Sequence, residues 1–179
     1  MHLYLSRHSY RLDRIEVPKT KVPDTCLHWS GVSKIIEQRE KIKWIDYIFS
    51  SPFLRCVQTA YHYNKFEAPI YLEYGLAEIL FPRFFDERPT LDKNLKRHYH
   101  TIDECYNSYI KEQEYIFPET REDQKNRVYK FLDWLQTSQY WNKNILLVGH
   151  GGSIKLCLKY FGIENPDDPK MGELHSIEM

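Results

Sequence analysis

Short runs of apolar, β-favouring residues recur along the chain, and most are followed by a segment whose apolar positions have helical spacing. A run of about four to eight such residues, bounded by turn residues, is typical of a buried strand. The pattern predicts strands in the run that begins at His2, at Lys43–Ser51, at Ala68–Tyr74 and at Ile145–Val148, and a last edge strand at Glu173–Met179.

The segments between these runs predict helices. They lie at Ser30–Lys41, with Val32, Ile35 and Ile36 on the inner face, at Phe53–Asn64, at Ile102–Ile116, after Thr120, and after Gly152, with Ile154, Cys157, Leu158 and Phe161 on one face. Asp24 or Thr25 is a candidate cap for the first of them. The helix after Thr120 has the clearest signal, because Thr120 and Asp123 form a capping-box pattern. Apolar residues then follow at helical spacing: Val128, Phe131, Leu132 and Leu135.

The alternation of strands and helices predicts an α/β fold with a mainly parallel sheet covered on both faces. The 179 residues are enough for one domain with a substantial core, and no linker divides the chain, so residues 1–179 are expected to form a single domain. Residues 81–103 contain Pro82, Pro89 and many charges, which indicates an irregular excursion that forms a lid or rim.

Composition narrows the class of protein. The 25 basic and 25 acidic residues balance, which argues against nucleic-acid or membrane-surface binding and requires any anionic ligand to be held by a local cluster. No run of apolar residues is long enough to span a membrane, and the charged start does not resemble a signal peptide. The four cysteines form no Cys-x-x-Cys pair, so buried, reduced thiols and a cytoplasmic location are expected.

Polar residues with complementary chemistry follow the predicted parallel strands. Arg7 and His8 come after the first strand, Arg55 after the second, Glu78 after the third and His150 after the fourth. Because the carboxyl ends of parallel strands meet at one edge of a sheet, these side chains are expected to converge. Two histidines, several arginines and a carboxylate in one crevice indicate a phosphoryl-transfer site.

Each residue has a predicted role. A neutral His8 can attack phosphorus as a nucleophile, and Arg7, Arg11 and Arg55 can bind the phosphoryl oxygens. His150, protonated near phosphate, adds a further donor, and Glu78 can protonate the leaving oxygen and then activate water. Gly151 and Gly152 allow close approach of an anion to the start of a helix. No metal or other cofactor is required by this scheme.

Plainer interpretations remain open for several residues. Arg55 taken alone is more typical of a surface ion pair, and Glu73 or Glu87 is an alternative to Glu78 as the acid. His98 and His100 lack a third ligand at metal-site spacing, so we favour a surface position for them. Three aromatic residues either line a substrate pocket or pack the excursion, and packing is favoured: Phe81, Phe84 and Phe85.

A cysteine-based phosphatase is excluded. That chemistry needs an arginine six positions after the nucleophilic cysteine, and the residues at those positions are Val32, His62, Lys111 and Ile163.

Four motifs together resemble the histidine phosphatase superfamily, also called phosphoglycerate-mutase-like. They begin at Arg7 (Arg-His-Ser-Tyr-Arg-Leu-Asp), Ser50 (Ser-Ser-Pro-Phe-Leu-Arg-Cys-Val-Gln-Thr-Ala), Gly75 (Gly-Leu-Ala-Glu) and Val148 (Val-Gly-His-Gly-Gly-Ser). The second motif is most similar to the branch that holds the phosphatase domains of suppressors of T-cell receptor signalling and the insect ecdysteroid-phosphate phosphatases. The resemblance spans about residues 2–161.

The resemblance implies a three-layer α/β/α sandwich and metal-independent catalysis through a phosphohistidine. It carries the nucleophile to His8, phosphate binding to Arg7, Arg11, Arg55 and His150, and the acid to Glu78. It departs at Ser9, where the family usually has glycine, and at Tyr10, where this branch often has glutamate.

A phosphomonoesterase acting on aryl phosphates, such as phosphotyrosine in a small molecule or phosphoprotein, is the expected function, and a homodimer is the expected assembly. The alternatives are a mutase or bisphosphoglycerate phosphatase, and a catalytically weak phosphate-binding scaffold.

Overall fold

A five-stranded sheet forms the centre of the protein in a computed structural model, which describes residues 2–14, 24–92 and 94–178. The strand order is β3-β2-β4-β1-β5. The strands pair in parallel except β5, which runs antiparallel to β1 along one edge. Their bounds are β1 His2–Arg7, β2 Tyr47–Ser50, β3 Ile70–Leu72, β4 Ile145–Gly149 and β5 Leu174–Glu178.

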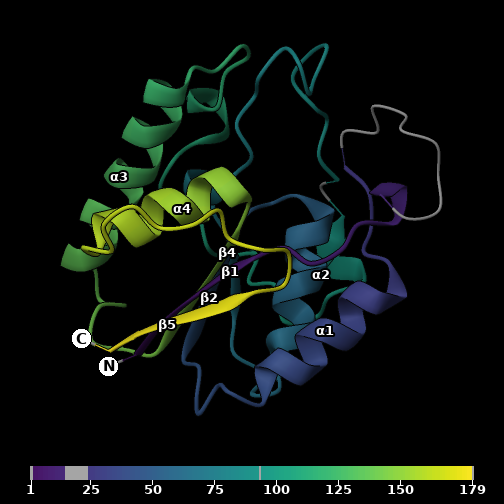
Figure 1. The fold of residues 1–179 in the computed structure, drawn as a ribbon, viewed down its shortest axis with the longest axis vertical. Helices are drawn as coiled ribbons and strands as arrows, with labels where there is room; N and C mark the ends of the chain where they lie inside the picture. Colours follow the sequence, from purple (N-terminus) through teal and green to yellow (C-terminus); the bar gives the residue numbers. More distant parts are fainter. Residues whose placement is uncertain (1, 15–23, 93, 179) are drawn as a thin grey trace.

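Two pairs of helices cover the sheet, one pair on each face (Figure 1). Helices α1 (Trp29–Arg39) and α2 (Leu54–Tyr63) pack together on one face, and α3 (Arg121–Thr137) and α4 (Gly151–Tyr160) on the other. The expected three-layer α/β/α sandwich with a mainly parallel sheet is confirmed. Within the described residues, four short 3₁₀ helices lie in the connections: Leu12–Arg14, Tyr74–Leu76, Leu95–Arg97 and Glu112–Glu114.

Side chains of the central strands divide between the two layers of core because successive residues of a strand point to opposite faces. In β4, Leu146 and Val148 pack toward α1 and α2, whereas Ile145 and Leu147 pack toward α3 and α4. All five residues of β4 are buried. A strand covered on both faces must be apolar throughout, which accounts for its continuous hydrophobic run.

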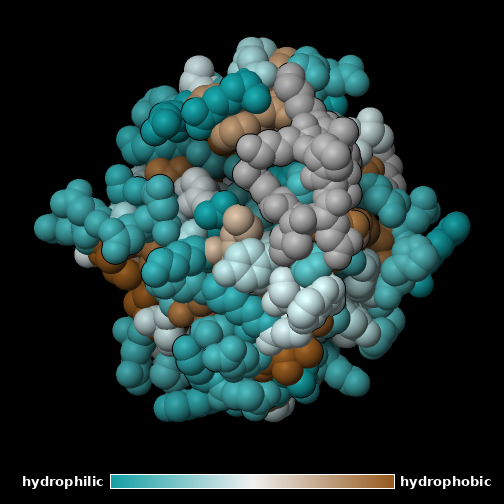
Figure 2. All heavy atoms as spheres, turned by 45° about the vertical axis from the view of Figure 1, so that its right-hand side comes forward, coloured by the Kyte–Doolittle hydropathy of each residue, from teal (hydrophilic) through white to brown (hydrophobic). Residues whose placement is uncertain are grey.

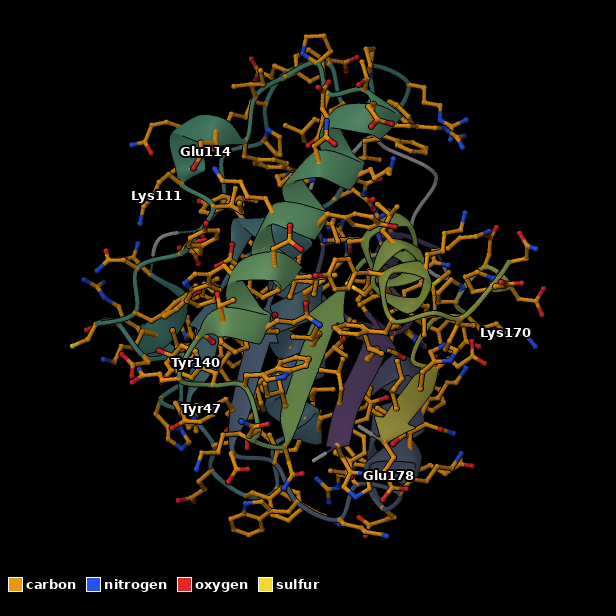
Figure 3. All side chains as sticks on the ribbon, turned by 90° about the vertical axis from the view of Figure 1, so that its left-hand side faces the viewer. Tyr47, Lys111, Glu114, Tyr140, Lys170 and Glu178 are labelled. Carbon is orange, nitrogen blue, oxygen red and sulfur yellow. The ribbon has the colours of Figure 1, made fainter. Side chains whose placement is uncertain are left out.

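Aromatic residues fill much of the layer between the sheet and α3. The Tyr47 and Tyr140 rings meet edge to face with centroids 4.9 Å apart (Figure 3). Phe49 contacts Tyr140 at 5.3 Å and Phe131 at 5.7 Å. The outer surface in Figure 2 is mostly hydrophilic, with hydrophobic residues in small separate groups. Many of the aromatic residues lie in the two core clusters or pack against them.

Helix α3 has the predicted start. The Thr120 hydroxyl accepts a hydrogen bond from the Asp123 amide at 3.1 Å, and the Asp123 carboxylate accepts one from the Thr120 amide at 2.9 Å. The four apolar residues predicted for its inner face are all buried: Val128, Phe131, Leu132 and Leu135.

Helix α1 begins at Trp29, one residue before the predicted Ser30, but the predicted cap, Asp24 or Thr25, is wrong. The cap is His28, whose ring accepts a hydrogen bond from the Ser30 amide, and Asp24 instead accepts one from the Leu54 amide at the start of α2. On the predicted inner face Ile35 is buried but Ile36 is 41% exposed. The buried position is taken by Gly31, which packs against the Tyr10 backbone so closely that a Cβ would lie 2.7 Å from its carbonyl oxygen.

The predicted helix at Ile102–Ile116 does not form; a single 3₁₀ turn lies there. The buried Glu73 carboxylate accepts hydrogen bonds from the Tyr109 and Ile110 amides at 2.8 and 3.1 Å, and from the Tyr106 hydroxyl at 2.6 Å. These donors are satisfied by a side chain distant in sequence, so no helical ladder is needed. This position also excludes Glu73 as a cavity acid.

Two predicted strands are shorter in the structure. Of Lys43–Ser51 only Tyr47–Ser50 pairs in the sheet, although Ile45 is still buried. Of Ala68–Tyr74 only Ile70–Leu72 is strand. The predicted strands were too long because they were drawn from apolar residues, and an apolar residue can be buried without pairing in the sheet. The edge strand β5 is confirmed, and Met179 lies outside the described residues.

In the described residues 81–92 and 94–103 the excursion is irregular, as predicted, apart from one 3₁₀ turn. Its end extends the sheet, because the Ile70 amide donates to Thr101 and the Asp103 amide donates to Ile70. Its beginning lines the cavity described below. The prediction that this segment forms a rim is therefore confirmed only for its first residues, 81–85, where the chain borders the cavity.

All four cysteines are free thiols. Cys56 and Cys157 are buried as expected, but Cys26 is half-buried and Cys105 is exposed in a turn. The prediction of burial is therefore wrong for the last two, because both lie in loops outside the two core layers. Over residues 2–14, 24–92 and 94–178, no helix is long and apolar enough to cross a membrane.

Candidate active site

A cavity of about 810 Å³ opens at the carboxyl ends of the parallel strands. Five of the predicted site residues line it directly: Arg7, His8, Arg11, Arg55 and Glu78. His150 lies beneath them in contact with His8 and Glu78. The convergence expected from the strand order is thus found in the structure.

His8 leaves β1 at the base of the cavity. Its amide donates to the Gly149 carbonyl at 2.9 Å, which continues the pairing of β1 with β4. Its Nδ1 lies 2.9 Å from the Ser9 carbonyl oxygen. Because a carbonyl oxygen only accepts, Nδ1 must carry the proton, and Nε2 keeps its lone pair. Burial, with the positive charge of Arg55, holds the pKa of His8 well below its usual range, so the ring is neutral at pH 7.

His150 joins β4 to α4 and is fully buried. Its Nε2 lies 2.9 Å from the Ser51 hydroxyl, its Nδ1 lies 3.2 Å from Glu78 Oε2, and its ring centroid is 5.3 Å from that of His8. Burial lowers the pKa of His150 to about 4, although the carboxylate opposes the change. The ring is therefore neutral in the free protein at pH 7, and the protonated form expected from the sequence requires a bound anion.

Arg55 is the second residue of α2 and only 1% exposed. Its guanidinium lies 3.2 Å from the Asp24 carboxylate and 3.7 Å from that of Glu78, and it stacks on the Phe53 ring at 4.5 Å. The interpretation of Arg55 as a surface residue is wrong. Asp24 was not predicted for this site: it lies 31 positions away in sequence, and only folding brings the pair together.

Glu78 follows the 3₁₀ turn at Tyr74–Leu76 and is partly accessible from the cavity. Burial acts to raise the pKa of Glu78, but His150 and Arg55 outweigh burial and lower it to about 2. Glu78 is therefore ionised in the free protein. Glu87, the other alternative, is exposed and does not line the cavity. Of the three carboxylates considered, the structure brings Glu78 alone to the histidines.

Arg7 and Arg11 lie on opposite sides of His8 in sequence and contact different groups. Arg7 donates to the Pro169 carbonyl at 2.9 Å, and its guanidinium packs on Gly151, where an added Cβ would lie 3.3 Å from the guanidinium carbon. A Cβ at this position would force the guanidinium to move by a few tenths of an ångström. Arg11 is held by Asp13, with Nε 2.8 Å from the carboxylate, so it presents less free charge to the cavity than the sequence indicates.

The turn after His8 differs from the family pattern in sequence but is firmly held. The Ser9 amide donates to the Thr59 hydroxyl at 3.2 Å, and the Tyr10 carbonyl accepts from the His28 amide at 2.9 Å. Ser9 is buried, so its hydroxymethyl group fills core space rather than the cavity.

All three phenylalanines assigned to packing line the cavity, but only Phe85 is also buried in the core. Phe85 packs against Phe53 as expected, with centroids 6.3 Å apart. Phe81 and Phe84 line the cavity, and Phe84 is 44% exposed. The packing interpretation is therefore wrong for these two. The sequence does contain a sign of this exposure. The residues that follow Phe81 and Phe84 are mostly polar or proline, and they supply few apolar side chains to bury the two rings.

Several cavity residues were not predicted from the sequence: Arg83, Arg121, Gln124, Lys155 and Lys159. Lys155 and Lys159 could have been found, because they are four residues apart on the helix that follows His150 and so share one face. Arg121 and Gln124 could not have been found, because no pattern in the sequence places the start of α3 near the carboxyl ends of the strands.

Three possible metal ligands lie close together. The ligand atoms of His8, Glu78 and His150 are all within 4.8 Å of one another. The positive charges of Arg55 and Arg7 act on the same histidines. A divalent cation would be repelled by both guanidiniums, so the site is better matched to an anion.

The fold and the site together define a class of protein. It is an α/β sandwich with histidines and arginines grouped at the carboxyl ends of its parallel strands. The family model of the histidine phosphatase superfamily, branch 1, matches residues 3–176. The chain belongs to this superfamily, whose members are phosphatases and mutases.

Several solved structures share the fold, and two of the three given below are named as phosphatases. The ecdysone phosphate phosphatase from Bombix mori, in complex with tungstate, has a TM-score of 0.77 at 16% identity, over 99% of this chain and 89% of that one. The α-ribazole phosphatase from Shigella flexneri has a TM-score of 0.69 at 20% identity, over 100% and 91% of the two chains. Bacillus stearothermophilus YhfR has a TM-score of 0.69 at 18% identity, over 99% and 90%. A comparison with curated proteins gives no match.

The resemblance noted in the sequence is in line with these comparisons. The superfamily is confirmed by the family model, and an ecdysone phosphate phosphatase, the kind of protein named for the resembling branch, is among the similar structures. At such low identity the structural comparisons establish the fold, and the substrate is a separate question.

Proposed function

We propose that the protein is a metal-independent phosphomonoesterase that hydrolyses aryl phosphates through a phosphohistidine on His8. The observation that carries the proposal is the grouping of a neutral His8, with a free Nε2, against His150, Arg55 and Glu78 at the base of one cavity. Superfamily membership supports phosphoryl chemistry in general.

In the first step His8 Nε2 attacks phosphorus and the P–O bond to the leaving group breaks. Attack needs the lone pair, which the depressed pKa of His8 keeps available at neutral pH. Arg7 and Arg55 bind the phosphoryl oxygens and offset the charge of the transition state. In the second step water gives a proton to Glu78 and attacks phosphorus, the P–N bond to His8 breaks, and inorganic phosphate leaves.

Glu78 is the proposed general acid, and it must gain a proton before it can give one. In the free protein the positive charge of Arg55 helps to keep it ionised. A bound phosphate dianion neutralises that charge and adds its own negative field, so the pKa of Glu78 rises when substrate binds. The same field raises the pKa of His150, which makes it a donor to phosphate.

The aryl preference rests on the cavity wall formed by Phe81 and Phe84. An exposed Phe84 beside a phosphate site offers a flat apolar surface to the ring of a phenol. Phosphotyrosine, free or in a phosphoprotein, has this chemistry. We also propose a cytoplasmic location, in keeping with four free thiols, and a homodimeric assembly.

The test is hydrolysis of 4-nitrophenyl phosphate in the presence of a chelator by the wild type, by His8→Ala, and by His98→Ala as a control at an exposed histidine outside the cavity. Turnover is expected to survive chelation, to vanish in the first variant and to be unchanged in the second. Trapping of ³²P in acid-labile form on the wild type would identify the phosphohistidine.

Two alternatives have distinct outcomes. A mutase would transfer the phosphoryl group to a second hydroxyl compound in preference to water. A phosphate-binding scaffold would bind phosphate without turnover. Loss of turnover on chelation, restored by a divalent metal, would contradict the metal-independent mechanism.

A further inference from the structure

Three cations on the cavity wall have no acidic partner within ion-pair distance in the described part of the chain: Arg83, Arg121 and Lys159. The other cavity cations differ, since Arg11 pairs with Asp13 and Lys155 pairs with Asp168 at 2.6 Å. The protein as a whole carries no net charge, so this excess is local. A local excess of unpaired cations favours an anionic ligand.

The two arginines are held on an aromatic surface. The Arg83 guanidinium lies 4.4 Å from the Phe84 ring centroid and 5.4 Å from that of Phe81. The Arg121 guanidinium lies 5.9 Å from the Phe81 centroid, on a different segment of the chain. These cation–π contacts, closer for Arg83 than for Arg121, restrict the side chains and leave N–H groups available, which reduces the entropy lost on binding a carboxylate or phosphate.

The cavity is larger than a phosphoryl group needs. Its volume of about 810 Å³ lies within the range of about 300–1,000 Å³ found for sites that hold whole small molecules. The phosphoryl group is accounted for by His8, Arg7 and Arg55. The part of the wall formed by the phenylalanines and the two arginines is therefore available to bind the leaving group of the substrate.

We propose that the leaving group of the substrate combines a planar ring with a second anionic group, and that Phe81 and Phe84 bind the ring while Arg83 and Arg121 bind the anion. This inference rests on the proposed phosphatase function and adds a substrate class to it. The chemistry has two sources: a small aryl phosphate that carries a carboxylate, and a phosphotyrosine with an acidic residue beside it in a peptide.

The test compares matched substrates that differ only in the second charge. The small-molecule pair is 4-carboxyphenyl phosphate and its N-methylamide, and the peptide pair places aspartate or asparagine beside phosphotyrosine. The amide is the better leaving group of the small-molecule pair, so intrinsic reactivity works against the expected preference. We expect kcat/KM to favour the charged member of at least one pair about tenfold, which is close to 1.4 kcal/mol, and the ratio to fall as salt is raised.

The variants are R83Q and R121Q, singly and together, with K125Q as the matched control. Lys125 is also a cation on α3 but does not line the cavity. All three positions are at the surface, and melting temperatures check the fold. The double variant is expected to bring the charge preference close to one, and K125Q to leave it unchanged.

Preference in one pair identifies the source of the second anion, and preference in both supports the shared chemistry. No preference in either pair, or a preference that survives in the double variant, would overturn the inference. If no substrate is turned over, the phosphatase function fails separately. Calorimetric affinities of the same pairs for His8→Ala then decide whether the charged member still binds more tightly.

Discussion

At the scale of single residues, the two buried histidines tie the site to the stability of the protein. The folded-state pKa values of His8 and His150 are lowered by burial, that of His150 to about 4. Below the ordinary histidine pKa of about 6.5 the unfolded chain binds protons that the folded protein does not. Each histidine therefore removes about 1.4 kcal/mol of stability per pH unit as the pH falls below about 6.5.

We expect the free energy of unfolding to decrease from pH 7 toward pH 4.5, and to decrease less steeply in His150→Asn. Glu78 adds loss at lower pH, because its folded pKa of about 2 is below the unfolded value and its contribution disappears as the pH falls through that range. Urea unfolding at half-unit pH steps measures the slope. A slope unchanged by the substitution would show that His150 is not the titrating group.

At the scale of elements, a buried ion pair connects α3 to the loop that carries Glu78. Arg127 lies 2.7 Å from Glu119, and its guanidinium also donates to the Gly75 carbonyl at 3.0 Å and the Ala77 carbonyl at 3.3 Å. The Tyr115 hydroxyl donates to the Glu78 carbonyl at 2.6 Å. These contacts make Arg127 a positioning residue for the proposed acid.

Arg127→Met is expected to lower the free energy of unfolding by about 3–5 kcal/mol, because Glu119 is left buried without its partner. It is also expected to slow phenyl phosphate more than 4-nitrophenyl phosphate, since the poorer leaving group depends more on Glu78. Glu78→Gln should show the same selectivity. A loss of stability with equal effects on both substrates would mean that Arg127 supports the fold and not the acid.

The capping box of α3 gives a separate prediction at this scale. Thr120→Ala removes the hydroxyl that accepts from the Asp123 amide, and it is expected to cost about 1 kcal/mol in denaturant unfolding. Thr137→Ala at the other end of α3, where the hydroxyl only contacts carbonyls of its own helix, is the control and should be nearly neutral. Equal effects at both ends would contradict the capping role.

At the scale of the whole molecule, a neutral chain concentrates cations in one cavity. Inorganic phosphate should therefore stabilise the protein at constant ionic strength, by about 2.7 kcal/mol at a hundred times its Kd. Arg55→Gln should reduce this stabilisation, because the guanidinium lies at the base of the cavity. The measurement is the melting temperature of the wild type and of Arg55→Gln, each in phosphate and in chloride at the same ionic strength. Equal stabilisation of wild type and variant would place the phosphate elsewhere.

The sequence by itself determined the layers and the inner part of the site. Continuous apolar runs such as Ile145–Val148 can only be satisfied between two layers of helices, and parallel strands bring their following residues to one edge. His8 and His150 were found in this way because each directly follows a strand, and Arg55 and Glu78 because each lies in the first turn of chain after one. The start of α3 was also predictable from nearby residues, because the side chains of Thr120 and Asp123 can reach each other's backbone amides at the start of any helix.

Only the tertiary structure decided the partners of these residues and the outer part of the cavity. Asp24 reaches Arg55 across 31 positions, Glu73 replaces a predicted helix with side-chain hydrogen bonds, and Arg83 and Arg121 meet on Phe81. None of these contacts follows from periodicity, because periodicity reports which face of an element is buried and not what lies against that face. Where elements pack side by side, the contacts between them depend on distances that the linear order of residues does not contain.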